Sequence, residues 1–488
     1  MLFELFADHR KPAMTRNSTR AVLALTGTAL FMIVLDNLIV ASALPAIERS
    51  LNSPLSSAEW ILDAYILSFA VLILTGAALG ERFGRRRVFV GGLVIFTAAS
   101  AAGALAANVG ELVAARAIQG AGSAILMPLT LTLLSSAFPP ERRGTALGIW
   151  SSIAGLGVAA GPIVGGVITD ALSWHWIFWI NVPVGVVAAV LSPRLLEESR
   201  GRREPIDLTG LALASTGLLG VVYATVRGND AGWVSASTLG AYAAGIALLI
   251  GFVAWEARQE HPMLPLRLFR SARFSISNIT GFLLHFTMFG AFLMTIQFLA
   301  EVRGESPVMT GVYTLPWTIM PLLVSPIAGR IGQRSNPAIP ATIGMTLLAL
   351  GALELAAQLD PSTTPLGLAP GLVSIGVGIG LVLPSIAALT MGSVDAADIG
   401  KASGTLSTAR QVGSVVGVAV AVAIFQAGGV PESHAAITSG ISNALTAGGI
   451  AALIGAAISL AIVPRAAAVL AAWRRPQTAL AEGADFRS

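Results

Sequence analysis

The chain has 488 residues, of which 55% are hydrophobic and only 11% are charged, and its mean hydropathy is +0.77. Soluble domains carry about 25% charged residues, so this composition excludes an ordinary water-soluble enzyme and a secreted scaffold. The net charge of +4 is too small to favour nucleic acid as a partner, and the absence of cysteine excludes a disulfide or a thiolate metal site. The sequence therefore predicts an all-α integral membrane protein.

A membrane-spanning helix needs about 20 apolar residues. Fourteen such stretches follow one another, at 21–43, 58–80, 88–107, 111–137, 144–170, 175–193, 207–227, 236–255, 274–300, 308–329, 338–357, 367–391, 401–427 and 440–463. Of the 30 Lys and Arg, 25 fall on one side of these spans, three fall on the other side and two lie within spans. Because cytoplasmic loops carry an excess of Lys and Arg, we expect a multi-pass protein of the inner (cytoplasmic) membrane with both termini cytoplasmic.

Two sequence repeats predict a duplicated half. Segments 79–86 and 327–334 share the pattern x-Arg-x-Gly-x-Arg at an offset of 248 residues, and a Gly-Thr pair at 144 recurs at 404, an offset of 260. Such repeats are typical of secondary transporters, whose site lies between two halves that rock against each other. The predicted parts are a tail (1–20), a six-helix bundle (21–200), two inserted spans (201–257), a second six-helix bundle (258–464) and a tail (465–488). Because one chain contains both halves, we expect a monomer.

Three charged side chains fall within predicted spans of the first half. Asp36, Asp63 and Arg116 each lie roughly 8–10 Å from the outer end of their span, at 1.5 Å per residue. Charges inside a membrane are costly and mark functional sites by default. The arginine needs a counter-ion, and two carboxylates for one arginine leave an excess of negative charge. This arrangement favours a site that holds either a proton or a positively charged cargo; a static ion pair between helices is the alternative interpretation.

The loop after the second span places an acid beside several arginines. Its residues are Glu81, Arg82, Gly84, Arg85 and Arg86. One interpretation is a cytoplasmic gating latch that breaks and reforms as the halves move. The other is simple anchoring by positive charge on the cytoplasmic side.

A stripe of small residues marks the fifth span, at Gly157, Gly161, Pro162, Gly165 and Gly166. Glycines four residues apart let a neighbouring helix approach closely, and proline permits a helix to bend. We expect this helix to be a hinge between outward-facing and inward-facing states.

Other polar groups within spans are secondary candidates. Arg410 lies near the middle of the thirteenth span, His285 near the middle of the ninth and Glu354 near the outer end of the eleventh. We interpret Arg410 as bonded to backbone or to a facing polar group, and His285 as a core histidine with satisfied hydrogen bonds; a proton site is the alternative for His285. The sequence shows no phosphate-binding loop and no metal-ligand spacing. We therefore expect no cofactor and no metal, with energy supplied by a proton gradient.

Five segments carry a family resemblance: 35–45 with Asp36, 60–65 with Asp63 and Tyr65, 79–86, 116–120 with Arg116 and Gln119, and 157–166. Together they resemble the fourteen-span drug:proton antiporters of the major facilitator superfamily, the EmrB/QacA type. The resemblance covers nearly the whole chain. It implies a major-facilitator fold with 14 transmembrane helices in pseudo-symmetric halves. It further implies that Asp36 and Asp63 bind protons and cargo and that Arg116 relays protons, with Tyr65 and Gln119 as secondary candidates.

The sequence departs from the family pattern at three positions. Glu81 stands where the family usually has Asp, and Ala77 stands where it usually has Gly. The second copy of the loop motif has Gly329 at the acidic position. We expect the latch acid to be present in the first half only.

These observations predict a proton-coupled antiporter that exports amphipathic, cationic small molecules, with membrane lipid as its surroundings and no nucleic-acid partner. The nearest alternative is an exporter of one neutral or anionic antibiotic or metabolite, in which Arg116 and Arg410 contact the cargo. An importer with the same fold is a further alternative, which the stripe in the fifth span disfavours. An enzyme is not expected, because no nucleophile with a base is found, and a sensor is disfavoured because no soluble output domain is inserted.

Overall fold

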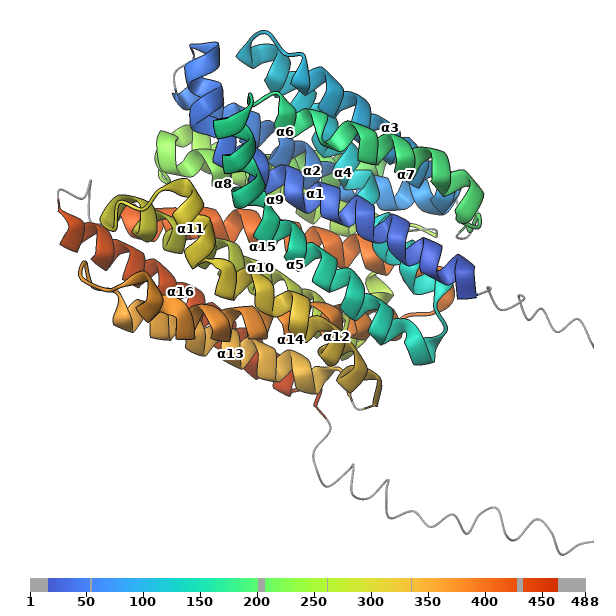
Figure 1. The fold of residues 1–488 in the computed structure, drawn as a ribbon. Coiled ribbons are helices and arrows are strands. Elements are labelled where there is room, and N and C mark those ends of the chain that lie inside the picture. Colours follow the sequence, from blue (N-terminus) through green and yellow to red (C-terminus); the bar gives the residue numbers. More distant parts are fainter. Residues whose placement is uncertain are drawn as a thin grey trace, which may run out of the picture.

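The computed structural model describes residues 16–52, 55–200, 207–260, 262–334, 336–427 and 433–463, and all regular secondary structure in them is helical (Figure 1). The first part of the chain forms α1 (Arg16–Leu51), α2 (Leu55–Phe83), α3 (Arg85–Ala104), α4 (Val109–Ala137), α5 (Pro140–Ala171), α6 (Trp176–Trp179) and α7 (Asn181–Leu195). Two helices follow, α8 (Leu208–Ala231) and α9 (Ala236–Glu256). The last part forms α10 (Ala272–Gln297), α11 (Pro307–Tyr313), α12 (Leu315–Arg334), α13 (Ala338–Gln358), α14 (Ala369–Gly392), α15 (Ile399–Gln426) and α16 (His434–Leu460). Short helices η1 (Leu266–Arg270), η2 (Phe298–Val302), η3 (Pro365–Leu368) and η4 (Ala396–Asp398) adjoin these.

Several helices begin at a capping side chain. Asn108 accepts a hydrogen bond from the Glu111 amide at the start of α4, and Ser235, Ser271 and Ser433 cap α9, α10 and α16 in the same way. Such caps satisfy amides that the first helical turn leaves unpaired. The caps and the apolar runs between them set the helix boundaries.

Among the described residues, thirteen helices are long and apolar enough to cross a membrane. The tenth predicted span, 308–329, is divided at Thr314 into α11 and α12, and α12 contains Pro321 and Pro326. Prolines and two arginines within the 20 residues of α12 lower the hydropathy of this helix, so α12 is not among the thirteen candidate spans. The fold is therefore a multi-pass helical bundle, and the count of fourteen spans stays a prediction.

Helix packing in the first part of the chain recurs in the last part. Helix α2 packs on α4 as α12 packs on α14, and α1 packs on α5 as α10 packs on α15. Likewise α3 packs on α4 and α7 as α13 packs on α14 and α16. This recurrence is the arrangement expected of a duplicated unit. We refer to α1–α7 as the first half and to α10–α16 as the second half.

Besides smaller contacts of α5 with α11 and α14 and of α4 with α15, two main interfaces join the halves, α5 against α12 and α2 against α15. The helices between the halves in sequence lie at the second of these. Helix α8 contacts both α2 and α15, while α9 packs mainly on α8. Only 17% of the most apolar window of α9 is buried, so most of this helix is exposed at the surface.

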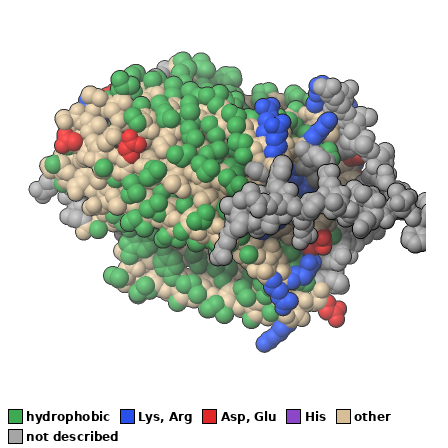
Figure 2. Space-filling model, turned by 90° about the horizontal axis from the view of Figure 1, so that it is seen from below, with side chains coloured by type: hydrophobic (Ala, Val, Ile, Leu, Met, Phe, Trp, Pro, Cys, Tyr) green, Lys and Arg blue, Asp and Glu red, His purple; other side chains and the backbone are tan. Residues whose placement is uncertain are grey.

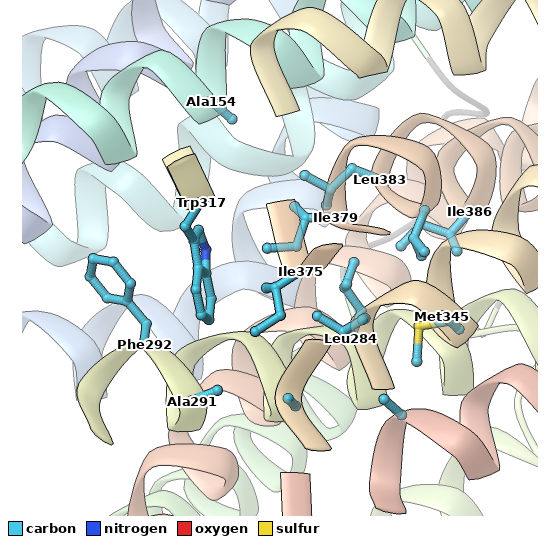
Figure 3. Close-up of a cluster of buried hydrophobic side chains, with 14 of the residues drawn as sticks. Ala154, Leu284, Ala291, Phe292, Trp317, Met345, Ile375, Ile379, Leu383 and Ile386 are labelled. Carbon is cyan, nitrogen blue, oxygen red and sulfur yellow. The ribbon is translucent and has the colours of Figure 1, made fainter. Parts of the chain in front are cut away.

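The surface and core have the polarity of a membrane protein. Figure 2 shows hydrophobic side chains over most of one face, with Lys and Arg gathered toward one end. The largest core cluster lies mainly in the second half, where Phe292 and Trp317 meet with ring centroids 5.5 Å apart (Figure 3). This cluster reaches Ile379 and Leu383, which border the cavity described below.

Candidate functional site

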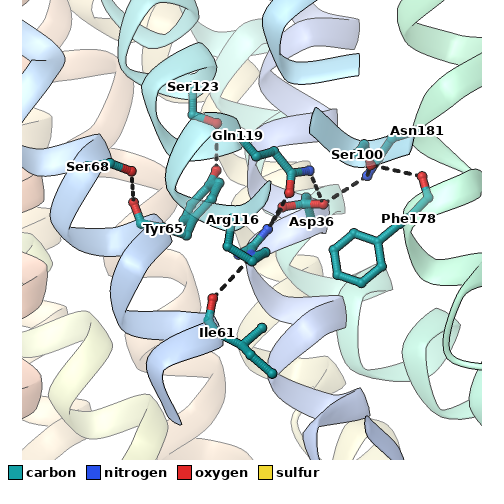
Figure 4. A network of polar contacts seen from close by, with 10 residues as sticks. All are labelled: Asp36, Ile61, Tyr65, Ser68, Ser100, Arg116, Gln119, Ser123, Phe178 and Asn181. Atoms are coloured by element: carbon teal, nitrogen blue, oxygen red, sulfur yellow. Dashed lines mark hydrogen bonds and ion pairs between the residues drawn. The ribbon is translucent and has the colours of Figure 1, made fainter. Parts of the chain in front are cut away.

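A buried ion pair joins α1 and α4 inside the first half. Arg116 Nη1 lies 2.5 Å from Asp36 Oδ2, and the two residues are 1% and 0% exposed (Figure 4). Losing one partner of such a pair strands a buried charge, which costs about 3–5 kcal/mol. The structure therefore brings together two of the three charges that the sequence places in these spans.

Neutral side chains complete the bonding of the Asp36 carboxylate. Gln119 Nε2 and Asn181 Nδ2 each donate to Oδ1 at 2.8 Å, and Gln119 Oε1 accepts from Arg116 Nη1 at 2.8 Å. Asn181 also donates to Ser100 Oγ at 3.2 Å. The carboxylate thus accepts from three side chains, Arg116 and Gln119 of α4 and Asn181 of α7.

The Arg116 guanidinium is held on its other sides by α2. It lies over the Tyr65 ring, with Cζ 4.1 Å from the centroid, and its Nε donates to the Ile61 carbonyl at 3.2 Å. The Tyr65 hydroxyl and Ser123 Oγ are 2.7 Å apart. Arg116 Nη2 is buried and has no hydrogen-bond partner among the described residues. We call Asp36, Arg116, Gln119, Asn181 and Tyr65 the Asp36 network.

Sequence reasoning missed the contributions of Asn181, Ser100 and Ser123. Asn181 opens α7 and is 2% exposed, and Ser100 Oγ donates to the Phe178 carbonyl just before it. An asparagine within an apolar run was the available signal, because a buried amide needs partners.

A cavity lies between the two halves, and neither Asp36 nor Arg116 lines it. Its empty volume is about 900 Å³, counted together with its open mouth. Both halves line it with apolar and aromatic side chains, including Phe69 from α2, Phe289 from α10 and Trp317 from α12. A mostly apolar cleft with a few placed polar groups is the usual form of a small-molecule site.

Two of the secondary candidates line this cavity, whereas Asp36, Asp63 and Arg116 do not. Arg410 Nε donates to His285 Nε2 at 3.0 Å, and His285 Nδ1 lies 3.0 Å from the Gly281 carbonyl. These bonds assign the proton of a neutral His285 to Nδ1. The Arg410 guanidinium also lies 5.9 Å from the ring centroid of Trp150, which comes from α5 of the first half.

Two further predicted acids, Asp63 and Glu354, lie on α2 and α13. Asp63 is half-buried on α2, two residues before Tyr65. Glu354 is half-buried on α13, where its Oε1 accepts from Gln358 at 3.2 Å. Neither Asp63 nor Glu354 is among the residues that line the cavity.

A buried ion pair forms where α2 ends and α3 begins, at the end of the bundle. Arg85 donates through Nε and Nη2 to the two carboxylate oxygens of Glu81, at 2.8 and 3.1 Å, and through Nη1 to Ser136 Oγ. A methyl group at Gly400, near the start of α15, would overlap the Glu81 carboxylate. Glu81 therefore lies against the N-terminal end of a second-half helix, where the helix dipole favours a negative charge.

The other arginines of this loop face a residue that the motif did not include. Arg86 and Arg87 donate their backbone amides to the Glu198 carboxylate at 3.1 and 3.3 Å. Gly84 joins α2 to α3 with φ of 109°, which glycine adopts readily, and a methyl group there would lie 2.7 Å from the same carboxylate. Arg82 is exposed and lies over the Phe83 ring.

The glycines of α5 pack against two different helices. Gly157, Gly161 and Gly165 face Val34, Leu38 and Ser42 of α1, so this stripe packs within the first half. Farther toward the start of α5, Gly144, Gly148 and Gly155 face α12 of the second half. Gly166 is buried, and the side chain of Pro162 lies outside the described residues.

Two helical bundles around a shared cavity are the architecture of a secondary transporter. The family model of the Major Facilitator Superfamily matches residues 26–418, and the chain therefore belongs to this superfamily of membrane transporters, which are not enzymes. The chain is 37% identical over 414 residues to the multidrug resistance protein Stp of Mycobacterium tuberculosis, covering 83% of this chain and 76% of that protein. It is 34% identical over 417 residues to the tetracenomycin C resistance and export protein of Streptomyces glaucescens, covering 84% and 77%.

The fold is also shared with a solved structure, that of the human organic anion transporter MFSD10. The TM-score is 0.64, with 15% identity, and the match covers 90% of this chain and 99% of that one. At this identity the likeness shows the fold alone.

Proposed function

We propose that this protein is a proton-coupled antiporter that exports amphipathic, antibiotic-like small molecules across the inner membrane by alternating access, with both termini cytoplasmic. The relatedness to a multidrug resistance protein and to an antibiotic exporter supports export of such compounds. We assign the proton coupling to the Asp36 network, because it holds a buried carboxylate on the same helix as Asn37, which lines the cavity.

Helix α1 provides the route between proton and cargo. Asp36 is paired with Arg116, while its neighbours Asn37 and Leu38 line the cavity. Protonation of Asp36 removes the counter-ion of Arg116, so the donors around the carboxylate must rearrange. A shift of α1 then changes the cavity wall directly. In this scheme Asp36 binds the proton and Arg116, Gln119 and Tyr65 respond to it.

Alternating access needs interfaces that open and close. In this structure α5 meets α12 and α2 meets α15, and these contacts include the ends that we predict to be cytoplasmic. Ser403 of α15 donates to the Pro128 carbonyl of α4 at 2.7 Å, and Thr145 of α5 donates to Gln333 of α12 at 3.0 Å. Glu81 packs at the same end. We propose that the latch formed by Glu81 and Arg85 holds these interfaces closed, and that α5 is the helix that bends when they open.

A cationic cargo requires an acid at the cavity, and the sequence-based expectation placed Asp36 and Asp63 there. Neither lines the cavity in this structure. We therefore assign proton binding to Asp36 and keep Asp63 as a further proton site. The charge of the cargo is inferred instead from the residues that line the cavity.

Export from everted membrane vesicles tests the coupling. Respiration sets up the pH gradient, and we measure uptake of fluorescein and of rhodamine 123 with and without an uncoupler. We expect uptake of at least one dye, its loss on uncoupling, and dye-induced proton release reported by a pH-sensitive fluorophore. Uptake that survives the uncoupler would refute proton coupling.

Matched variants then locate the proton site. We expect Asp36→Asn to abolish gradient-driven uptake in protein that inserts normally, and Asp63→Asn to show whether the second acid contributes. Asp360→Asn is the control, because Asp360 is an exposed loop residue given the same chemical change. Full coupling in Asp36→Asn would remove Asp36 from the mechanism.

A further inference from the structure

The polar part of the cavity wall is basic. Its charged or titratable lining residues are Arg410 and His285, and among the described lining residues there is no Asp or Glu. The polar remainder consists of amides and hydroxyls, including Asn37 and Gln411. A molecule in this cavity therefore meets a positive charge and no negative one.

Arg410 is poorly satisfied by the protein itself. It is 7% exposed, and its one hydrogen bond among the described residues is the donation from Nε to His285. The two terminal amino groups have no hydrogen-bond partner there, and neither do the side chains of Asn37 and Gln411. A buried cation without a counter-ion is costly, so a position of this kind needs a compensating anion.

The surroundings of Arg410 fix where such an anion would sit. His285 holds Nε from the α10 side, and the Trp150 ring stabilises the guanidinium from α5. The fork formed by Nη1 and Nη2 is left for the cavity, and this planar fork matches a carboxylate or a phenolate. The same cavity is lined by Phe69, Phe289 and Trp317, which suit an apolar or aromatic body.

We propose that the cargo is an organic anion with an aromatic or apolar body, whose carboxylate or phenolate pairs with Arg410 in the cavity. This inference rests on the proposed export function and specifies its substrate class. Asn37 from the first half and Gln411 from the second half bond the polar groups of the same molecule. A bound anion thus contacts both halves and links their movement.

A matched dye pair tests the charge. Fluorescein and rhodamine 123 share the xanthene ring system and carry opposite charges at pH 8. We measure their equilibrium binding to the purified full-length protein by fluorescence anisotropy, without any gradient. The variants are Arg410→Gln, Arg410→Lys and Arg273→Gln; the last removes an exposed arginine at the start of α10 and serves as the control for net charge.

We expect the wild-type protein to bind fluorescein more tightly than rhodamine 123. Arg410→Gln should weaken fluorescein binding about 10- to 100-fold, the range for a hydrogen bond to a charged group, and should not weaken rhodamine 123 binding. Arg410→Lys should keep part of the affinity for fluorescein, because it keeps the charge, and Arg273→Gln should keep all of it.

Three results would overturn the proposal: a wild-type preference for rhodamine 123, no fluorescein binding by the wild-type protein up to millimolar concentration, or equal weakening of both dyes by Arg410→Gln. The last would mean that Arg410 supports the shape of the cavity and not its charge. Because binding is measured without a gradient, these results are independent of the uncoupler test. Loss of proton coupling with retained fluorescein preference would refute the proposed antiport and leave the anion site standing.

Discussion

Adding one methyl group at Gly148 should weaken the closed contact between α5 and α12. Gly148 packs directly on the backbone of α12, and an added Cβ would lie 2.5 Å from the Ser325 carbonyl oxygen and 3.0 Å from Pro326 Cα. Backbone atoms of a helix cannot rotate away as the end of a side chain can. Gly148→Ala therefore requires the two helices to separate.

The size of the effect follows from these distances. An ordinary contact begins near 3.4 Å, so the carbonyl oxygen and the new methyl group are about 0.9 Å too close. Overpacking of this kind costs roughly 1–3 kcal/mol. If that cost falls on the closed state alone, the ratio of closed to open protein should fall by about 5- to 150-fold. The matched control is Gly91→Ala in α3, where an added methyl group would meet no atom within 4 Å.

Distance measurement between the halves provides the assay, and the chain contains no cysteine to remove. Cysteines introduced at the exposed positions Arg142 and Gly392 carry the spin labels. Pulsed electron paramagnetic resonance then measures the distance between α5 and α14. We expect Gly148→Ala to shift the distribution to longer distances and Gly91→Ala to leave it unchanged. A folded Gly148→Ala protein with the wild-type distribution would refute the reasoning, as would an equal shift in Gly91→Ala.

Two further predictions concern the buried Asp36–Arg116 pair and the half-buried Glu198. Asp36→Asn and Arg116→Gln should each lower the free energy of unfolding by about 3–5 kcal/mol. The double variant should lose clearly less than the sum of the two, because neither charge is then left without its partner. Additive losses in thermal unfolding would show that the two groups do not interact. Glu198→Gln should lower stability by about 1 kcal/mol, because Glu198 accepts the first amides of α3 and faces the positive end of the helix dipole. Hydrogen exchange of the Arg86 and Arg87 amides should rise in this variant, and unchanged exchange would contradict the capping role.

Much of the membrane architecture is predictable because it depends on local composition. Long apolar runs, capping serines and loop arginines are all properties of adjacent residues. The stripe at Gly157, Gly161 and Gly165 predicts a close helix neighbour, and α1 lies against it. The tenth span shows the limit of this approach, since Thr314 and the prolines after it divide the apolar run into α11 and α12.

The candidate site was predictable only in part. The need of Arg116 for a counter-ion follows from its position in an apolar run, and Asp36 meets that need. Asn181 and Glu198 come from segments far away in the sequence, and no local pattern links them to Asp36 or to the loop after α2.

The sequence by itself determined which segments enter the membrane and which charges enter with them, because hydropathy is a local property. Tertiary structure decided what each of those charges faces. Successive residues of a helix point about 100° apart, so a side chain and its neighbour can face different surroundings. Asp36 is enclosed by donors inside the first half while Asn37 lines the cavity, and the charge in the cavity wall comes from Arg410 instead. Only the rotation of each packed helix about its axis assigns these roles.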